Sequence, residues 1–146
     1  MPELAKLSRP RSFRETLKYI DNLIKSNYTD THCLRILELG GGNSDWLCHF
    51  GETYNCQLLA IDYSEKGCEL LCRKIKGKHL NCKIINKDFH DLNSTDIDTP
   101  LAIIVSFRLL EHLTNRDIIY EIAMRYLNFQ GLFISILLNL AGLNLK

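Results

Sequence analysis

The sequence lacks a strong excess of charge of either sign. Its 146 residues contain 18 Lys and Arg against 17 Asp and Glu, which gives a formal net charge of +1. Proteins that bind nucleic-acid phosphates usually carry a marked basic excess, so we expect no nucleic-acid partner. With 46% hydrophobic residues, a chain of this length can bury one core, and one folded domain is the first expectation.

Hydrophobic targeting segments and the usual metal motifs are also absent. Residues 1–10 contain no apolar segment of signal-peptide length, and no stretch approaches the roughly 20 apolar residues of a membrane-spanning helix. We therefore expect a cytoplasmic protein that does not span a membrane. The six cysteines contain no Cys-x-x-Cys pair and the histidines share no metal-ligand spacing, so no metal site is expected.

The sequence does contain a regular alternation of strand-like and helix-like segments. Apolar runs predict strands at residues 34–39, 56–62, 82–86, 101–106 and 132–138. Helical periodicity and capping residues predict helices at 12–26, 44–54 and 64–76, and a fourth that begins at Thr114. Because the strands are apolar on both faces and separated by helices, they indicate a parallel sheet in a doubly wound α/β fold. We divide the chain into an amino-terminal arm and helix, residues 1–33, and a core, residues 34–146.

Four of the predicted strands end in or just before a polar residue: Glu38, Asp62, Asp88 and Ser106. The carboxyl ends of parallel strands meet at one edge of the sheet, and ligands of open α/β sheets bind beyond that edge. The sequence therefore predicts a ligand site there.

Three consecutive glycines, Gly40, Gly41 and Gly42, follow the first strand. A dinucleotide-binding fingerprint would need another glycine at the position of Asp45, whose negative charge would also disfavour a pyrophosphate. No Lys or Arg lies between residues 36 and 65 to offset that charge. The pattern disfavours phosphate ligands, although a nicotinamide-dependent oxidoreductase would use the same fold and stays open as an alternative.

A ligand with a positive charge and a ribose, but no phosphate, suits these strand ends better. Glu38 could face an ammonium group, and Asp62, some twenty residues further on, is placed to accept hydrogen bonds from two ribose hydroxyls. S-adenosylmethionine has an amino group, a sulfonium and a ribose, and it carries no phosphate.

At five places the sequence resembles the class I S-adenosylmethionine-dependent methyltransferases, and in particular their small-molecule, ubiquinone-biosynthesis-like branch. The matching segments, in chain order, are "ELGGGNS" (38–44), "LLAIDYS" (58–64), "NKDFHDL" (86–92), "IIVSFRLLEHL" (103–113) and "YLNFQGLFISI" (126–136). In the first segment, Ser44 stands where the family has its third glycine. The five segments occur in the family's order and spacing, so the resemblance covers most of the core.

The resemblance implies a Rossmann-like sheet with strand order 3-2-1-4-5 and two further strands that this sequence lacks. We therefore expect a chain truncated after strand five, whose open edge is covered by a second copy or another partner. The resemblance also implies S-adenosylmethionine as cofactor and a small-molecule methyl acceptor, which the residues do not identify. The implied cofactor-binding residues are Glu38, Gly40, Gly41, Gly42, Asp62, Tyr63, Asp88, Phe89 and Ser106.

Each of these roles has a plainer alternative. His112, beside Glu111, is the candidate general base for an acceptor that is protonated at working pH, but a histidine near a helix start is often only packed and hydrogen-bonded. Asp62 could simply cap the helix after it, and Phe89 could be a core residue. For the whole chain, a non-catalytic methyltransferase-like remnant or interaction module is the main alternative.

Overall fold

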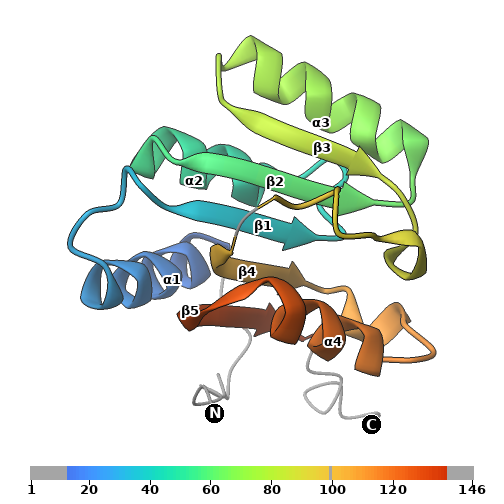
Figure 1. Ribbon diagram of the computed structural model, residues 1–146. Coiled ribbons are helices and arrows are strands. Elements are labelled where there is room, and N and C mark those ends of the chain that lie inside the picture. The colour runs from blue at the N-terminus through green and yellow to red at the C-terminus, as the bar shows by residue number, and fades with distance from the viewer. Residues whose placement is uncertain (1–12, 99, 138–146) are drawn as a thin grey trace, which may run out of the picture.

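The computed structural model describes residues 13–98 and 100–137, which form a five-stranded sheet with helices on both faces (Figure 1). The strands are β1 (Arg35–Leu39), β2 (Gln57–Asp62), β3 (Cys82–Asn86), β4 (Leu101–Phe107) and β5 (Leu127–Ile136). The helices are α1 (Phe13–Asn27), α2 (Asp45–Tyr54), α3 (Glu65–Gly77) and α4 (Asp117–Tyr126), with short 3₁₀ turns η1 (Phe89–Asp91) and η2 (Leu110–His112).

The strands lie in the order β3-β2-β1-β4-β5, and every neighbouring pair is parallel. This confirms the predicted doubly wound α/β sheet and its strand order. In the central strand β1, Leu39 pairs with Ile61 of β2 on one side and with Ser106 of β4 on the other. The ends of β1, β2 and β4 are therefore aligned, and the segments that follow them begin side by side.

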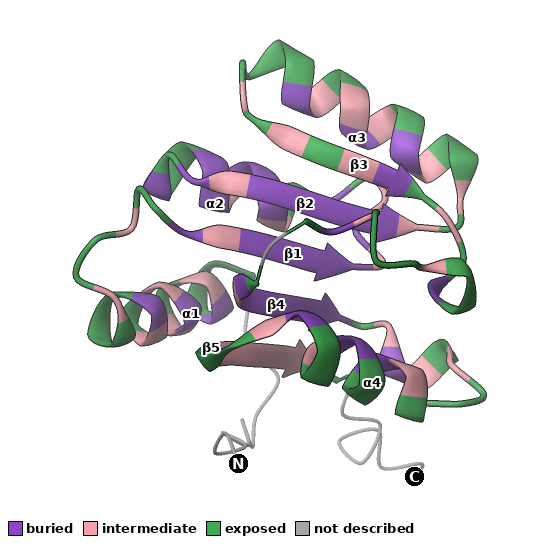
Figure 2. Ribbon diagram, in the orientation of Figure 1, coloured by how far each residue is buried: buried purple, intermediate pink, exposed green. Residues whose placement is uncertain are grey.

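Each face of the sheet carries its own apolar cluster (Figure 2). On one face, Ile36 and Leu58 lie in a cluster with buried residues of α1, α2 and α3. On the other, Leu37 and Leu59 lie in a cluster with residues of α4 and with Phe89 of η1. Since adjacent residues of a strand point to opposite faces, burial on both sides explains why the strands are apolar throughout.

The predicted helix starts are confirmed for α2 and α3 and wrong for α4. Ser44 and Ser64 accept hydrogen bonds from the amides of Leu47 and Gly67, which satisfies one free donor at each helix start. Helix α4 begins at Asp117 rather than at Thr114, and no side chain caps it. The predicted capping residue of α1, Ser12, lies outside the described residues. No helix in the described part of the chain is both long enough and apolar enough to cross a bilayer.

Strand β5 differs most from its prediction. It begins at Leu127, directly after α4, and not at residue 132 after a turn. Its pairing with β4 shifts between Leu127 and Leu132, so the intervening residues form an irregularity, and Phe129 within it is 97% exposed. A side chain on Gly131 would lie 2.6 Å from Leu127, so this glycine serves close packing within the strand. The predicted strand end at residue 138 lies outside the described residues.

Candidate functional site

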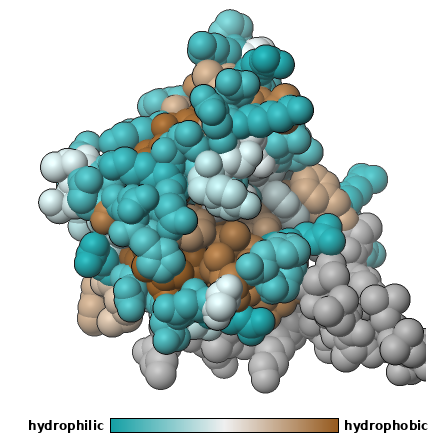
Figure 3. All heavy atoms as spheres, turned by 90° about the vertical axis from the view of Figure 1, so that its right-hand side faces the viewer, coloured by the Kyte–Doolittle hydropathy of each residue, from teal (hydrophilic) through white to brown (hydrophobic). Residues whose placement is uncertain are grey.

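The carboxyl ends of the strands point to one side of the molecule, and Figure 3 looks directly at that side. Apolar and weakly polar residues lie in a hollow near its centre, surrounded by hydrophilic residues (Figure 3). The segments after β1, β2 and β4 begin at this edge, so it is the place where the sequence-predicted site residues can meet.

The segment after β1 is a tight turn that needs glycine. Gly40 has a φ of 72°, a region that glycine enters without strain, and Asn43 at 57° adopts the same left-handed conformation. A Cβ atom on Gly42 would lie only 2.7 Å from Oδ2 of Asp62 and 3.1 Å from Cα of Gly67. The glycines therefore let the turn approach the start of α3 and the end of β2 very closely.

All five backbone amides from residue 40 to residue 44 donate hydrogen bonds within the protein. Their acceptors in chain order are the carbonyl of Ile61 (twice), the Asp62 carboxylate, and the carbonyls of Gly67 and Gly41, at 2.8, 3.3, 2.8, 2.9 and 3.1 Å. Loops that bind phosphate do so with free, converging amide groups. This turn has none to offer, which agrees with the expectation that its ligand carries no phosphate there.

Asp62 links the turn to β2. Its Oδ2 accepts from the amide of Gly42 and its Oδ1 from the amide of Ser64, both at 2.8 Å. A carboxylate offers about four acceptor positions, so each oxygen retains capacity for one more donor. Asp62 thus does two things that the sequence left as alternatives. It orders the start of α3, and it can still accept hydrogen bonds from a ligand with two neighbouring hydroxyls.

The side chain of Glu38 is buried under the glycine turn and does not reach the protein surface. It is 3% exposed, and its Oε2 accepts a hydrogen bond from Oγ of Ser44. Burial raises the pKa of Glu38 to about 8, and the nearby charges of Asp62 and Asp45 add to the rise, while the Ser44 hydroxyl opposes it. A carboxyl with this pKa is mostly neutral at pH 7, so the geometry favours a role in holding Ser44 at the start of α2.

The charge of Asp45 has a partner that the sequence argument missed. Nζ of Lys74 lies 2.7 Å from Oδ1 of Asp45 and also donates to the carbonyl of Asn43. Lys74 lies outside residues 36–65, and α3 brings it to Asp45 because the helix packs beside the turn. The argument against a phosphate ligand therefore rests on the backbone amides of the turn, which all donate to acceptors within the protein.

The end of β3 adds one unpredicted contact. Nδ2 of Asn86 donates to the carbonyl of Asp62 at 2.9 Å and so joins the ends of two strands. Asp88 caps η1 and bonds His90, whose backbone N–H and ring hold the pKa of that exposed carboxyl below its usual range. Phe89 is buried in the core cluster of its face, and Tyr63 is 76% exposed. Of these three side chains, Tyr63 is the most accessible.

Three buried polar atoms near the ends of β4 and β5 have no hydrogen-bond partner among the described residues: Oγ of Ser106, Oγ of Ser135 and, in η2, Oε2 of Glu111. Ser106 and Ser135 are paired in register on neighbouring strands. Ser106 is fully buried, so it does not lie open to a ligand as the sequence suggested. His112 is exposed, and its side chain forms no hydrogen bond with the described residues.

Two features of the site were not anticipated from the sequence. Leu109, which follows β4, lies against Gly40, since a Cβ there would be 3.1 Å from Cδ1 of Leu109. Trp46 of α2 stacks on Phe107 at the end of β4. Both contacts join segments far apart in the chain, and only their positions next to recognised motifs could have indicated them. In the described ranges, no group of three or more His, Cys, Asp or Glu is arranged to hold a metal.

Comparison with known proteins agrees with this geometry. Residues 36–131, which contain the glycine turn and all of β2, β3 and β4, match a family described as "Methyltransferase domain". No curated protein matches the sequence significantly. Because the family match extends over more than half of the sequence, the chain belongs to this methyltransferase domain family.

Solved structures with the same fold are numerous, and three illustrate the range. PKMT2 of Rickettsia typhi, in complex with AdoHcy, is 24% identical with a TM-score of 0.65, covering 70% of this chain and 20% of its own. A coclaurine N-methyltransferase bound to N-methylheliamine and SAH is 18% identical with a TM-score of 0.67, covering 89% and 38%. An S-adenosylmethionine-dependent methyltransferase of Clostridium acetobutylicum is 16% identical with a TM-score of 0.72, covering 86% and 50%. The chain thus spans half or less of these proteins.

Proposed function

We propose that the chain binds S-adenosylmethionine at the carboxyl edge of its sheet and transfers the methyl group to a small-molecule acceptor. The observation that carries the proposal is the pairing of the glycine turn with Asp62. The turn's amides are all satisfied within the protein, and the Asp62 carboxylate keeps acceptor capacity on both oxygens. That combination suits a ribose-bearing ligand without phosphate.

The cofactor would supply a methyl group on a sulfonium, which is already a good leaving group. The chain has then mainly to hold it in line with an acceptor. We assign to Asp62 the role of accepting hydrogen bonds from the ribose hydroxyls. We assign to Gly40, Gly41 and Gly42 the role of letting the ligand approach the backbone closely. Tyr63, Asp88 and Phe89 follow the ends of β2 and β3, and we assign them to the border of the adenine.

The other predicted site residues receive different proposed roles. Glu38 is buried and mostly neutral, so we propose that it supports the cofactor site from below through Ser44. Ser106 supports it from within the sheet. His112 is exposed at the same edge. We retain it as the candidate general base, which would remove a proton from a methyl acceptor that is protonated at working pH.

Isothermal titration tests this proposal directly. S-adenosylhomocysteine should bind with one site per chain, and S-adenosylmethionine should compete for it, whereas NAD should produce no heat. Saturable NAD binding that competes with S-adenosylhomocysteine would favour the nicotinamide-dependent alternative. A folded sample that binds neither compound would favour a non-catalytic, methyltransferase-like remnant.

The partner that we propose for this chain is a second copy of itself, at β5. Among the described residues β5 pairs only with β4, so its other edge has no strand beside it. Phe129 of β5 and Leu137, which directly follows the strand, are exposed. An uncovered apolar edge strand invites pairing with another chain, and a second copy would cover both edges at once.

A further inference from the structure

Three aromatic side chains from separate elements meet beside the glycine turn. Trp46, in the first turn of α2, stacks on Phe107, the last residue of β4, with ring centroids 4.2 Å apart and planes inclined by 29°. Phe13, at the start of α1, meets Trp46 edge-on with centroids 4.5 Å apart. We call Phe13, Trp46 and Phe107 the aromatic wall.

The aromatic wall leads from the core to the surface. Phe107 is buried and lies near the fully buried Phe50, whereas Trp46 is only partly buried and Phe13 is 48% exposed. A half-exposed ring at the end of such a series can accept a further ring. Aromatic pairs contribute about 0.5–1.5 kcal/mol beyond the burial of their area, so a planar ligand would gain from this position.

A cation follows the aromatic wall directly in the chain. Arg108 succeeds Phe107 and adopts a φ of 55°, which is strained for a residue with a side chain. Its amide donates to the carbonyl of Ile136 at 2.8 Å, which holds this conformation in place. Arg108 is exposed, and it forms no ion pair with the described residues.

Arg108 and the aromatic wall also adjoin the proposed cofactor site. Leu109, the next residue, lies against Gly40, and Trp46 begins the helix that the turn leads into. A compound bound on the wall would therefore lie beside the glycine turn, and a guanidinium would be available for an anionic group. Arginine binds carboxylates through two parallel hydrogen bonds, which makes it selective for planar anions.

We propose that the methyl acceptor is a planar aromatic compound that carries an anionic group, with its ring on the aromatic wall and its anion on Arg108. This inference rests on the proposed methyltransferase function and names the substrate class of the same site. The competing explanation is that Phe13, Trp46 and Phe107 serve only to attach α1 to α2, in which case aromatic anions have no special affinity.

The experiment uses three matched probes and one reporter. Trp46 is the only tryptophan, so its indole N–H gives a single assigned signal in an NMR spectrum. In the presence of saturating S-adenosylhomocysteine, benzoate should shift this signal saturably. Benzyl alcohol, which has the ring without the charge, should bind at least about tenfold more weakly, because a hydrogen bond to a charged group is worth about 1.5–3 kcal/mol. Cyclohexanecarboxylate, which has the charge without the aromatic ring, should also bind more weakly.

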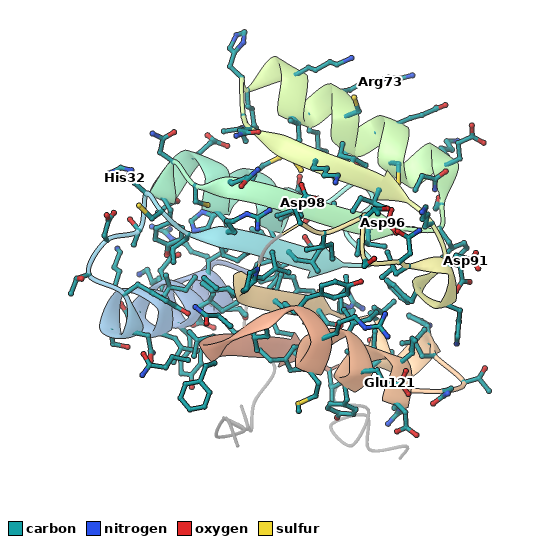
Figure 4. The ribbon with its side chains drawn as sticks, in the orientation of Figure 1. His32, Arg73, Asp91, Asp96, Asp98 and Glu121 are labelled. Atoms are coloured by element: carbon teal, nitrogen blue, oxygen red, sulfur yellow. The ribbon has the colours of Figure 1, made fainter. Side chains whose placement is uncertain are left out.

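Two variants test whether Arg108 binds the anionic group of the probe. Arg108→Gln should reduce benzoate affinity to that of benzyl alcohol. Arg73→Gln should leave it unchanged, because Arg73 lies on α3, away from the end of β4 (Figure 4). Equal affinities for the three probes, or unaltered benzoate binding in Arg108→Gln, would overturn the inference. Titration with S-adenosylhomocysteine alone distinguishes this failure from failure of the proposed function, since cofactor binding does not require an aromatic acceptor.

Discussion

The carboxyl edge of the sheet has two halves that differ in how completely their polar groups are satisfied. In the half formed by β1, β2 and β3, the amides of the glycine turn, the Asp62 carboxylate and the Asn86 side chain all have partners. In the half formed by β4 and β5, Ser106, Ser135 and Glu111 carry buried atoms that have no partner in the part of the chain that the structure describes. The strained Arg108, which directly follows β4, lies in that same half.

Under the proposed function, the contrast corresponds to two ligands, a cofactor and a methyl acceptor. A half whose groups already satisfy one another is preformed and can bind an invariant cofactor without rearrangement. A half with spare polar groups and a partly exposed aromatic wall is suited to an acceptor that differs between proteins. Variants in the first half should therefore affect cofactor binding, and variants in the second should affect acceptor binding and self-association.

The largest effect is expected for Gly42→Ala. The new Cβ atom would lie 2.7 Å from Asp62 and 3.1 Å from the backbone of Gly67, so the turn must move. We expect a loss of folding free energy near the upper end of the about 1–3 kcal/mol typical of overpacking, and at least about a hundredfold loss of S-adenosylhomocysteine affinity. Gly77→Ala is the matched control, because a Cβ there meets nothing within 4 Å. Equal behaviour of the two variants in denaturation and titration would contradict the preformed turn.

Asp62→Ala should have the next largest effect. It leaves the amides of Gly42 and Ser64 without their acceptor and removes the proposed ribose contact. Cofactor affinity should fall by about 1–3 kcal/mol, which is roughly ten- to a hundredfold. Asp98→Ala removes an exposed carboxylate from the segment before β4 and serves as control. Normal titration of S-adenosylhomocysteine with Asp62→Ala would show that the cofactor is held elsewhere.

Glu38→Gln tests the buried support of the turn through its pH dependence. The pKa of Glu38 rises from 4.5 to about 8 on folding, so the folded protein holds a proton that the unfolded chain releases. Its contribution to stability is complete below pH 4.5 and is lost as the pH rises toward 8. Each pKa unit corresponds to about 1.4 kcal/mol, so Glu38→Gln should flatten the decline in unfolding free energy across this window. An unchanged slope would mean that Glu38 is already ionised in the folded state.

A smaller effect is expected at the open edge of β5. Phe129→Glu places a charge on the most exposed apolar side chain of that strand. If a second copy covers this edge, sedimentation should show a concentration-dependent dimer for the unaltered chain and a shift toward monomer for the variant. Tyr63→Glu, an exposed substitution after β2, should leave the association unchanged. A stable monomer of the unaltered chain at high concentration would remove the case for self-association.

The smallest effect concerns the unpartnered hydroxyls. Ser135→Ala removes a buried hydroxyl without a hydrogen bond and should raise the unfolding free energy by about 1 kcal/mol in the absence of ligand. Ser26→Ala, at an exposed hydroxyl on α1, should change it by less. A loss of stability in Ser135→Ala would show that the hydroxyl is satisfied, for example by a bound water.

The sequence predicts the first half of the edge better than the second, for a physical reason. The capping serines, the glycine turn and Asp62 act through neighbours in sequence or through pairing in register, so local pattern reveals them. The partnership of Asp45 with Lys74, the stack of Trp46 on Phe107 and the burial of Ser106 depend on how distant elements pack. The strand was predicted to begin only at residue 132 because glycine is typical of turns, whereas Gly131 lies within β5 and packs against Leu127.

The central position of β1 also has a consequence for how the chain folds. Arg35 of β1 pairs with Gln57 of β2, whereas Ile36 pairs with Ile103 of β4, which lies about three times further along the chain. Closing the longer loop costs about 1 kcal/mol more in chain entropy. We expect β1, β2 and β3 to assemble first, and during synthesis they emerge first as well. Until β4 has been synthesised, the edge of β1 that pairs with β4 is exposed. The nascent chain is therefore most open to mispairing while residues 87–107 are being synthesised, and slow synthesis prolongs this period.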